Sequence, residues 1–288
     1  MGMILIVISL LVHQAEGVVV KEYGKRYGKG GMFFNAIICL FALIYFFVAE
    51  FFSGEYKFYF PKELFSYGII SGLCYATGFY AMYAALKTGS FGLTKLLSSF
   101  GSLIPIVYGI VFLNEQPANF TYVAIVLVLI SVFLMNHKST DEKVNFSVKW
   151  LVCVIASIIA NAGIMIVAKS QQLVFDTKCS NEFLMISYAL AVVFLVIFGI
   201  IYERSQFKST IKGGSVYGLL AGVFNGMNNV LILLTYLYVP LTIITPVKGA
   251  LGLVISFVLS VLLYKEKFTK KQIVSVVIGI IAAVLSKL

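Results

Sequence analysis

Ten apolar segments, each about as long as a bilayer is thick, follow one another along this chain with only short polar links between them. A spanning helix needs about 20 apolar residues, and without water its backbone polar groups must pair within the helix. The runs are continuous rather than alternating, which excludes a β-barrel. The segments are Gly2–Val20, Met32–Phe52, Phe65–Leu86, Leu93–Leu113, Phe120–Asn136, Val148–Ala168, Glu182–Tyr202, Ser215–Leu237, Leu241–Tyr264 and Lys271–Leu288.

The composition supports the same class, because 60% of the 288 residues are hydrophobic and only 12% are charged. No soluble core absorbs so many apolar side chains. We therefore predict an all-α integral membrane protein of ten transmembrane helices in one compact membrane domain, without a soluble appendage. The stretch Met1–Val20 lacks the basic start and the small-residue cleavage site of a signal peptide, so we interpret it as the first spanning helix.

The net charge of +10 indicates orientation rather than nucleic-acid binding. Most Lys and Arg residues lie in alternate links, and such links normally face the cytoplasm. We expect a multi-pass protein of a bacterial plasma membrane, and the charge bias predicts that both termini lie outside.

Metal, nucleotide and catalytic signatures are not found in the sequence. Four cysteines and two histidines have no metal-site or disulfide spacing, and the link GKRYGKGG lacks the Gly-Lys-Ser/Thr order of a phosphate loop. No nucleophile, base and orienting group form a catalytic set. We predict no enzyme activity, no metal and no cofactor.

Three sequence similarities recur at displacements of 148 to 151 residues. Ser9–Lys21 (SLLVHQAEGVVVK) resembles Ser157–Lys169 (SIIANAGIMIVAK), Gly72 corresponds to Gly222, and the ending LNE at Glu115 corresponds to YKE at Glu266. The similarities predict two five-helix copies, residues 1–147 and 148–288. Because five is odd, the second copy is inverted, as in many secondary transporters whose site lies between the copies.

Two stretches, Pro105–Glu115 and Pro246–Glu266, each precede one closing apolar helix. This arrangement resembles the drug/metabolite transporter superfamily, in its ten-helix EamA-like branch. The resemblance implies a 5+5 fold whose central cavity is lined by the first, third, fourth, sixth, eighth and ninth helices. It also implies export or exchange of amino acids, nucleotide sugars, sugar phosphates or other small metabolites. Many members keep their termini in the cytoplasm, opposite to the charge bias of this chain.

Two lysines inside apolar segments are candidates for substrate binding. Lys248 lies in the ninth segment near Pro246, with Thr242 and Thr245 at helical spacing, and an intramembrane cation marks a functional site by default. In the fourth segment, Lys95 shares one helical face with three serines, for which helix packing and snorkelling are the alternative explanations. Sugar-phosphate carriers of the superfamily hold phosphate with basic residues on these two helices, although Lys95 aligns with Pro246 rather than with Lys248. The serines are Ser98, Ser99 and Ser102.

A carboxylate in the first segment is the third charged candidate. Placing Glu16 in mid-helix costs about 2.5–3.5 kcal/mol on insertion scales, and His13 lies one turn before it. Small multidrug-resistance proteins, which the chain resembles here, carry a proton-exchanging glutamate on their first helix. Pairing with Lys21 near the membrane edge is the alternative.

Uncharged polar side chains complete the candidate set. Asn225, Asn228 and Asn229 share one face of the eighth segment, where they bind a polar solute or hydrogen-bond other helices. Asn161 occupies the repeat position of His13. Tyr75, Thr77, Tyr80 and Tyr83 lie on the third segment, and Thr77 and Tyr80 are the better cavity candidates.

Two cationic candidates against one anionic candidate favour a secondary transporter of an anionic or zwitterionic metabolite: an amino acid, an organic acid or a phosphorylated compound. The expected partners are the bilayer and the solute, with or without a coupling proton or cation, and no nucleic acid. A proton-coupled exporter of cationic drugs that uses Glu16, a channel, and a non-transporting scaffold are the alternatives. Monomer and homodimer both remain open.

Overall fold

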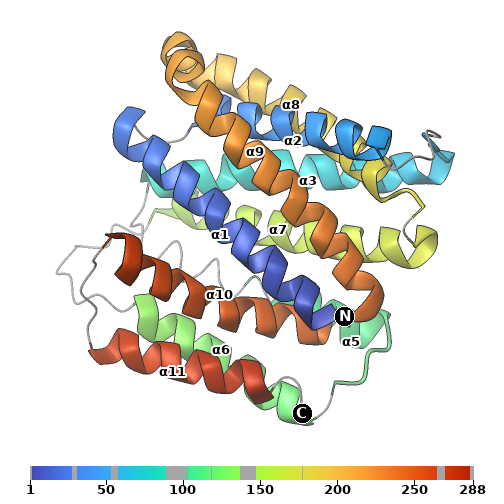
Figure 1. The fold of residues 1–288 in the computed structure, drawn as a ribbon, viewed down its shortest axis with the longest axis vertical. Helices are drawn as coiled ribbons and strands as arrows, with labels where there is room; N and C mark the ends of the chain where they lie inside the picture. The colour runs from blue at the N-terminus through green and yellow to red at the C-terminus, as the bar shows by residue number, and fades with distance from the viewer. Residues whose placement is uncertain are drawn as a thin grey trace. The chain divides into compact units, whose positions relative to one another are not determined.

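The computed structural model describes residues 2–27, 31–52, 58–88, 101, 103–117, 119–136, 147–176, 178–264 and 270–285. Across these ranges the secondary structure is helical throughout, with ten α-helices and one short 3₁₀ helix (Figure 1). The elements are α1 (Gly2–Tyr27), α2 (Met32–Phe52), α3 (Lys62–Thr88), α5 (Leu103–Phe112), α6 (Asn119–Asn136), α7 (Val148–Phe175), α8 (Ser180–Tyr202), η2 (Arg204–Gln206), α9 (Phe207–Tyr238), α10 (Leu241–Tyr264) and α11 (Lys270–Leu285).

Five of the described helical stretches are long and apolar enough to cross a membrane: α1, α2, α7, α8 and the stretch from Arg204 to Tyr238. The described parts of α5, α6, α10 and α11 contain shorter apolar stretches. Large apolar side chains are exposed on these helices, including Phe52, Val148 and Val216. Such side chains contact lipid in a bilayer, so the all-α, multi-pass membrane class is confirmed.

Several helices are longer than the apolar segments from which we predicted them. In α7 the extra length places the charged side chain of Lys169 within a helix. We expected the sixth span to end at Ala168, which leaves Lys169 in a polar link. Instead α7 continues to Phe175, and Lys169 is buried with its Nζ donating to the carbonyl oxygen of Tyr236 at 2.5 Å. That carbonyl belongs to the last turn of α9, where a cation compensates the helix dipole.

The chain divides into two compact units, neither of which coincides with a half of the sequence. Unit 1 comprises Met1–Tyr83 and Gly163–Tyr238, and unit 2 comprises Ala84–Ala162 and Val239–Leu288. Each unit therefore contains segments from both proposed copies, and α7 contributes to both. The duplication into residues 1–147 and 148–288 stays a prediction.

In unit 1, α9 packs against both α1 and α2, and α2 also packs against α8. The approach of α9 to α2 is close at Gly222, where an added Cβ would lie 2.7 Å from the carbonyl oxygen of Ile38. Tyr23 of α1 stacks on Phe34 of α2 with ring centroids 3.7 Å apart. These contacts place the asparagine-bearing face of α9 beside the middle of α1.

In unit 2, α10 packs against α5, α6 and α11. Ser131 of α6 and Ser275 of α11 exchange hydrogen bonds, each hydroxyl donating to the carbonyl oxygen of the other residue. Glu115 stabilises the beginning of α10, because its Oε1 accepts from the backbone N–H of Leu241 at 2.9 Å and its Oε2 from that of Thr242 at 3.0 Å. The motif glutamate therefore pairs amide groups that a helix N-terminus leaves without an intrahelical acceptor.

Candidate functional site

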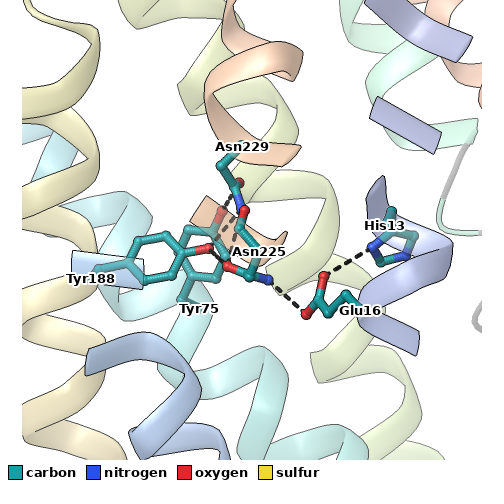
Figure 2. A network of polar contacts seen from close by, with 6 residues as sticks. All are labelled: His13, Glu16, Tyr75, Tyr188, Asn225 and Asn229. Carbon is teal, nitrogen blue, oxygen red and sulfur yellow. Dashed lines mark hydrogen bonds and ion pairs between the residues drawn. The ribbon is translucent and has the colours of Figure 1, made fainter. Parts of the chain in front are cut away.

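Unit 1 contains a network of six polar side chains from four helices (Figure 2). Its ionisable members lie on α1, and hydrogen bonds connect them with side chains of α3, α8 and α9. The network comprises His13, Glu16, Tyr75, Tyr188, Asn225 and Asn229.

The Glu16 carboxylate is the anionic end of this network. Its Oε1 accepts a hydrogen bond from Asn225 Nδ2 at 2.9 Å, and its Oε2 lies 3.3 Å from His13 Nδ1. The Glu16 side chain is 12% exposed, whereas that of His13 is 58% exposed. The pair therefore connects an accessible imidazole with a carboxylate that is largely enclosed.

Beyond Asn225, the hydrogen bonds have one direction. Tyr75 donates to Asn229 Oδ1 at 2.8 Å, and Asn229 Nδ2 donates to the Tyr188 hydroxyl at 2.8 Å. The Tyr188 hydroxyl then donates to Asn225 Oδ1, which leaves the Asn225 amide N–H pointing at Glu16. Each donor in the series faces the carboxylate end, so the network orients Asn225 to stabilise a negative charge on Glu16.

The local sequence of α9 explains how its asparagines reach this position. Asn225, Asn228 and Asn229 recur at helical spacing, and Gly226 between them allows the ring of Tyr45 on α2 to approach closely. Asn228 adds an acceptor that the network does not use, because its Oδ1 is buried and no described residue donates to it. A row of carboxamides with a spare acceptor suits hydrogen bonding to a polar solute.

The third helix contributes a different residue from those that the sequence favoured. Thr77 is exposed and its hydroxyl donates to the Leu73 carbonyl of its own helix at 2.7 Å. Tyr80 packs its ring near Phe198 and Tyr202, with centroids 5.0 and 5.3 Å away. Tyr75 joins the network instead.

Tyr188 of α8 was not a candidate, because nothing in its flanking sequence distinguishes it from the other tyrosines. Its burial beside Asn225 and Asn229 depends on how α8 packs in unit 1. A general physical rule was the only available signal: carboxamides that are partly buried within a spanning helix require hydrogen-bond partners, and these commonly come from a neighbouring helix.

The remaining candidates lie in unit 2 or outside the described residues. Lys248 is half-buried on α10, and no described residue hydrogen-bonds or ion-pairs with it. The Thr245 hydroxyl donates to the Leu241 carbonyl at 2.8 Å, and Asn161 Nδ2 donates to the Ser157 carbonyl at 2.7 Å. Within the described ranges, no three His, Cys, Asp or Glu side chains are placed to hold a metal ion. Lys95, Ser98, Ser99 and Ser102 lie outside those ranges.

In unit 1, apolar helices that carry a partly buried carboxylate and its hydrogen-bond partners are typical of a multi-pass membrane protein with a functional site within its spans. The sequence profile of the EamA-like transporter family matches residues 1–137 and 148–288. The chain therefore belongs to the EamA-like family of drug/metabolite transporters, as the resemblance indicated.

A solved crystal structure of another protein has the same fold, with a TM-score of 0.81 over 99% of this chain and 96% of that chain. The two sequences are 12% identical, so the likeness concerns the fold alone. A search of curated proteins finds no match.

Proposed function

We propose that this protein is a secondary transporter that moves a small anionic or zwitterionic metabolite by alternating access, and that Glu16 exchanges the coupling proton. The observation that carries the proposal is the Glu16 carboxylate of unit 1, held between Asn225 and the exposed His13. A carboxylate within a spanning helix is costly and is retained where it serves transport.

Proton exchange fits the chemistry of this pair. When His13 is protonated, it forms an ion pair with Glu16, and when Glu16 is protonated, its hydroxyl can donate to the neutral His13 ring. Asn225 offers its N–H to Oε1 in both states. The network therefore tolerates either charge on Glu16 without breaking, which a group that cycles between two protonation states requires.

The substrate class follows from the charges that the chain places in its spans. Lys248 of α10 has no described counter-charge, and Lys95 is a second cation in an apolar segment. A lysine within a spanning segment attracts an anion or the acidic group of a zwitterion. We therefore favour an amino acid, an organic acid or a phosphorylated compound.

Export of organic cations is the second candidate function. It is favoured by Glu16, because a mostly enclosed carboxylate beside carboxamide and phenol groups attracts a cation and then releases it upon protonation. The two lysines in apolar segments of the sequence argue against a cationic solute.

The architecture that we propose is two inverted five-helix copies in a bacterial plasma membrane, with both termini outside. The match of the family profile over two stretches, residues 1–137 and 148–288, supports the duplication. The excess of Lys and Arg in alternate links supports the orientation.

Purified protein in liposomes tests the coupling role. A panel of amino acids, organic acids and phosphorylated metabolites identifies a solute, and uptake is then compared with and without an imposed pH gradient. Glu16→Gln should lose the pH-driven accumulation but keep solute exchange. Glu22→Gln on the same helix, at an exposed residue paired with Arg26, is the matched control and should behave as the unaltered protein. If the Glu16→Gln variant still accumulates solute in response to the pH gradient, Glu16 has no role in coupling.

A further inference from the structure

Three basic side chains lie along one exposed side of the helical stretch that begins at Arg204 and continues through α9. They are Arg204, Lys208 and Lys212, and their spacing of four residues places them on one side of the helix. No described residue forms an ion pair with any of the three, and α9 contains no acidic residue. The described part of the chain therefore does not neutralise the positive charge of these residues, which we name the basic stripe.

The basic stripe lies at the depth of the lipid head groups. The apolar segment of this helix begins at Ser215, whereas the helix itself begins at Phe207. The first two turns therefore extend about 11 Å beyond the apolar segment. Head groups border the hydrocarbon core of a bilayer on each side, so these two turns contact the head-group region. Long basic side chains are well suited to this position, because their stems cover apolar surface while their charges stay in water.

The same side of α9 continues into exposed apolar side chains. Val216, Leu219 and Val223 follow Lys212 at spacings of four, three and four residues, which keeps them in line with the basic stripe. Their exposed fractions are 70%, 43% and 38%. One side of the helix therefore presents cations at one level and an apolar surface, which we name the apolar stripe, at the next. A phospholipid has its phosphate and its acyl chains in this same order, whereas a soluble anion has no part that matches the apolar stripe.

The end of α1 adds positive charge at the same end of unit 1. The ring of Tyr27 lies directly against Gly213, so α1 ends where α9 begins (Figure 1). Lys25 and Arg26 are exposed there. They share one carboxylate, because Glu22 lies 2.9 Å from Arg26 Nε and 3.9 Å from Lys25 Nζ. This end of the unit therefore carries an excess of cations, of which the basic stripe is the part without a paired acid.

The opposite end of unit 1 has a different charge balance. There the last turns of α7 lie beside the last turn of α9, where Lys169 donates to the Tyr236 carbonyl, and beside the first turns of α3. Where α3 begins and α7 ends, two cations and two anions are exposed among the described residues: Lys62, Glu63, Asp176 and Lys178. The excess of positive charge is therefore specific to the end that carries the basic stripe.

We propose that the basic stripe and the apolar stripe together form a binding surface for an anionic phospholipid. The phosphate of the lipid pairs with the cations at the beginning of α9, and an acyl chain lies along the apolar stripe. Basic residues next to a membrane attract anionic lipids electrostatically, whereas the ammonium group of a zwitterionic lipid offsets this attraction. The proposal concerns a partner of the helix that also carries Asn225, and it does not depend on the proposed transport.

Native mass spectrometry of the detergent-purified protein tests this proposal without requiring a known solute. The delipidated protein is mixed with dioleoyl phosphatidylglycerol or with dioleoyl phosphatidylcholine, and the lipid-bound fraction is measured over the same range of lipid concentrations. Phosphatidylglycerol should bind roughly tenfold more tightly than phosphatidylcholine. Equal binding of the two lipids would overturn the proposal, because they differ in head-group charge and not in their acyl chains.

Two matched double variants locate the binding surface. Lys208→Gln/Lys212→Gln should weaken phosphatidylglycerol binding by about tenfold or more, since each basic residue near a lipid surface contributes several-fold to the attraction. Lys62→Gln/Lys178→Gln removes the same charge from the opposite end of unit 1 and should leave binding unchanged. All four side chains are exposed, so both variants should fold. Equal weakening by the two variants would mean that net charge alone attracts the lipid, and would overturn the binding surface.

A soluble head group separates a lipid from a free anion as the ligand. Glycerol phosphate carries the same phosphate without acyl chains, so at an equal concentration it should not displace phosphatidylglycerol. Displacement would show that the basic stripe binds a soluble anion, and the lipid surface would then be wrong.

Discussion

The carboxylate of Glu115 offers a quantitative test of how unit 2 is stabilised. It accepts two backbone hydrogen bonds, at 2.9 and 3.0 Å, from the first two residues of α10. Leu241 and Thr242 are 0% and 1% exposed, so water has little access to their amide groups once the carboxylate is removed. Glu115→Ala therefore leaves two helix N-terminal donors without an acceptor.

The expected cost combines two known effects. Loss of an N-terminal cap costs about 0.5–2 kcal/mol, and a hydrogen bond to a charged group contributes about 1.5–3 kcal/mol. Because Glu115 itself is half-buried and its own solvation offsets part of this gain, we expect a destabilisation of roughly 2–3 kcal/mol. For a chain of this size, that loss lowers the midpoint of thermal unfolding by about 4–10 °C.

The assay is thermal unfolding of detergent-solubilised protein, followed by intrinsic fluorescence. Glu115→Gln should lose about half as much stability, since one carboxamide oxygen remains to accept. Glu22→Ala removes an exposed ion pair with Arg26 and should shift the midpoint by less than about 1 °C. A Glu115→Ala midpoint equal to that of the unaltered protein would refute the capping role.

Three further predictions concern charge, orientation and reactivity. Lys248→Ala should abolish uptake into liposomes while the protein still folds, and full transport would remove Lys248 from the substrate site. A cysteine added after Leu288 should react with an impermeant reagent from outside intact cells, and reaction only after permeabilisation would reverse the orientation. Burial raises the pKa of the Cys179 thiol, so less thiolate is present at pH 7. Cys179 should therefore react more slowly with maleimide than a free thiol and accelerate as the pH rises, and a rate equal to that of a free thiol would contradict its burial.

The class of fold was predictable because long apolar runs determine helices in a bilayer with little help from tertiary context. Glu16 and the asparagines of α9 were also identifiable, since polar groups in such runs are costly. Their pairing was not, because Asn225 lies 209 residues from Glu16 in sequence. Tyr75 joined the network where Thr77 and Tyr80 were favoured, because only the packing of α3 against α8 and α9 distinguishes these faces.

Other features depend on where polar residues sit in a folded helix. The apolar run before Lys169 ends at Ala168, whereas α7 continues to Phe175 and Lys169 donates to the last turn of α9. The role of Glu115 was hidden because its partners, Leu241 and Thr242, belong to a distant helix end. The part of Asn228 depends on its buried Oδ1, to which no described residue donates, and this burial cannot be predicted from the sequence.

Solute accumulation in liposomes tests the central claim most directly. Liposomes containing the purified protein are loaded with buffer, incubated with a mixture of amino acids, organic acids and phosphorylated metabolites, washed, and analysed by mass spectrometry. The account predicts that at least one anionic or zwitterionic metabolite accumulates above protein-free liposomes, with uptake that saturates and that an imposed pH gradient increases. Accumulation of none of these metabolites, or flux that rises linearly with concentration, would contradict the account.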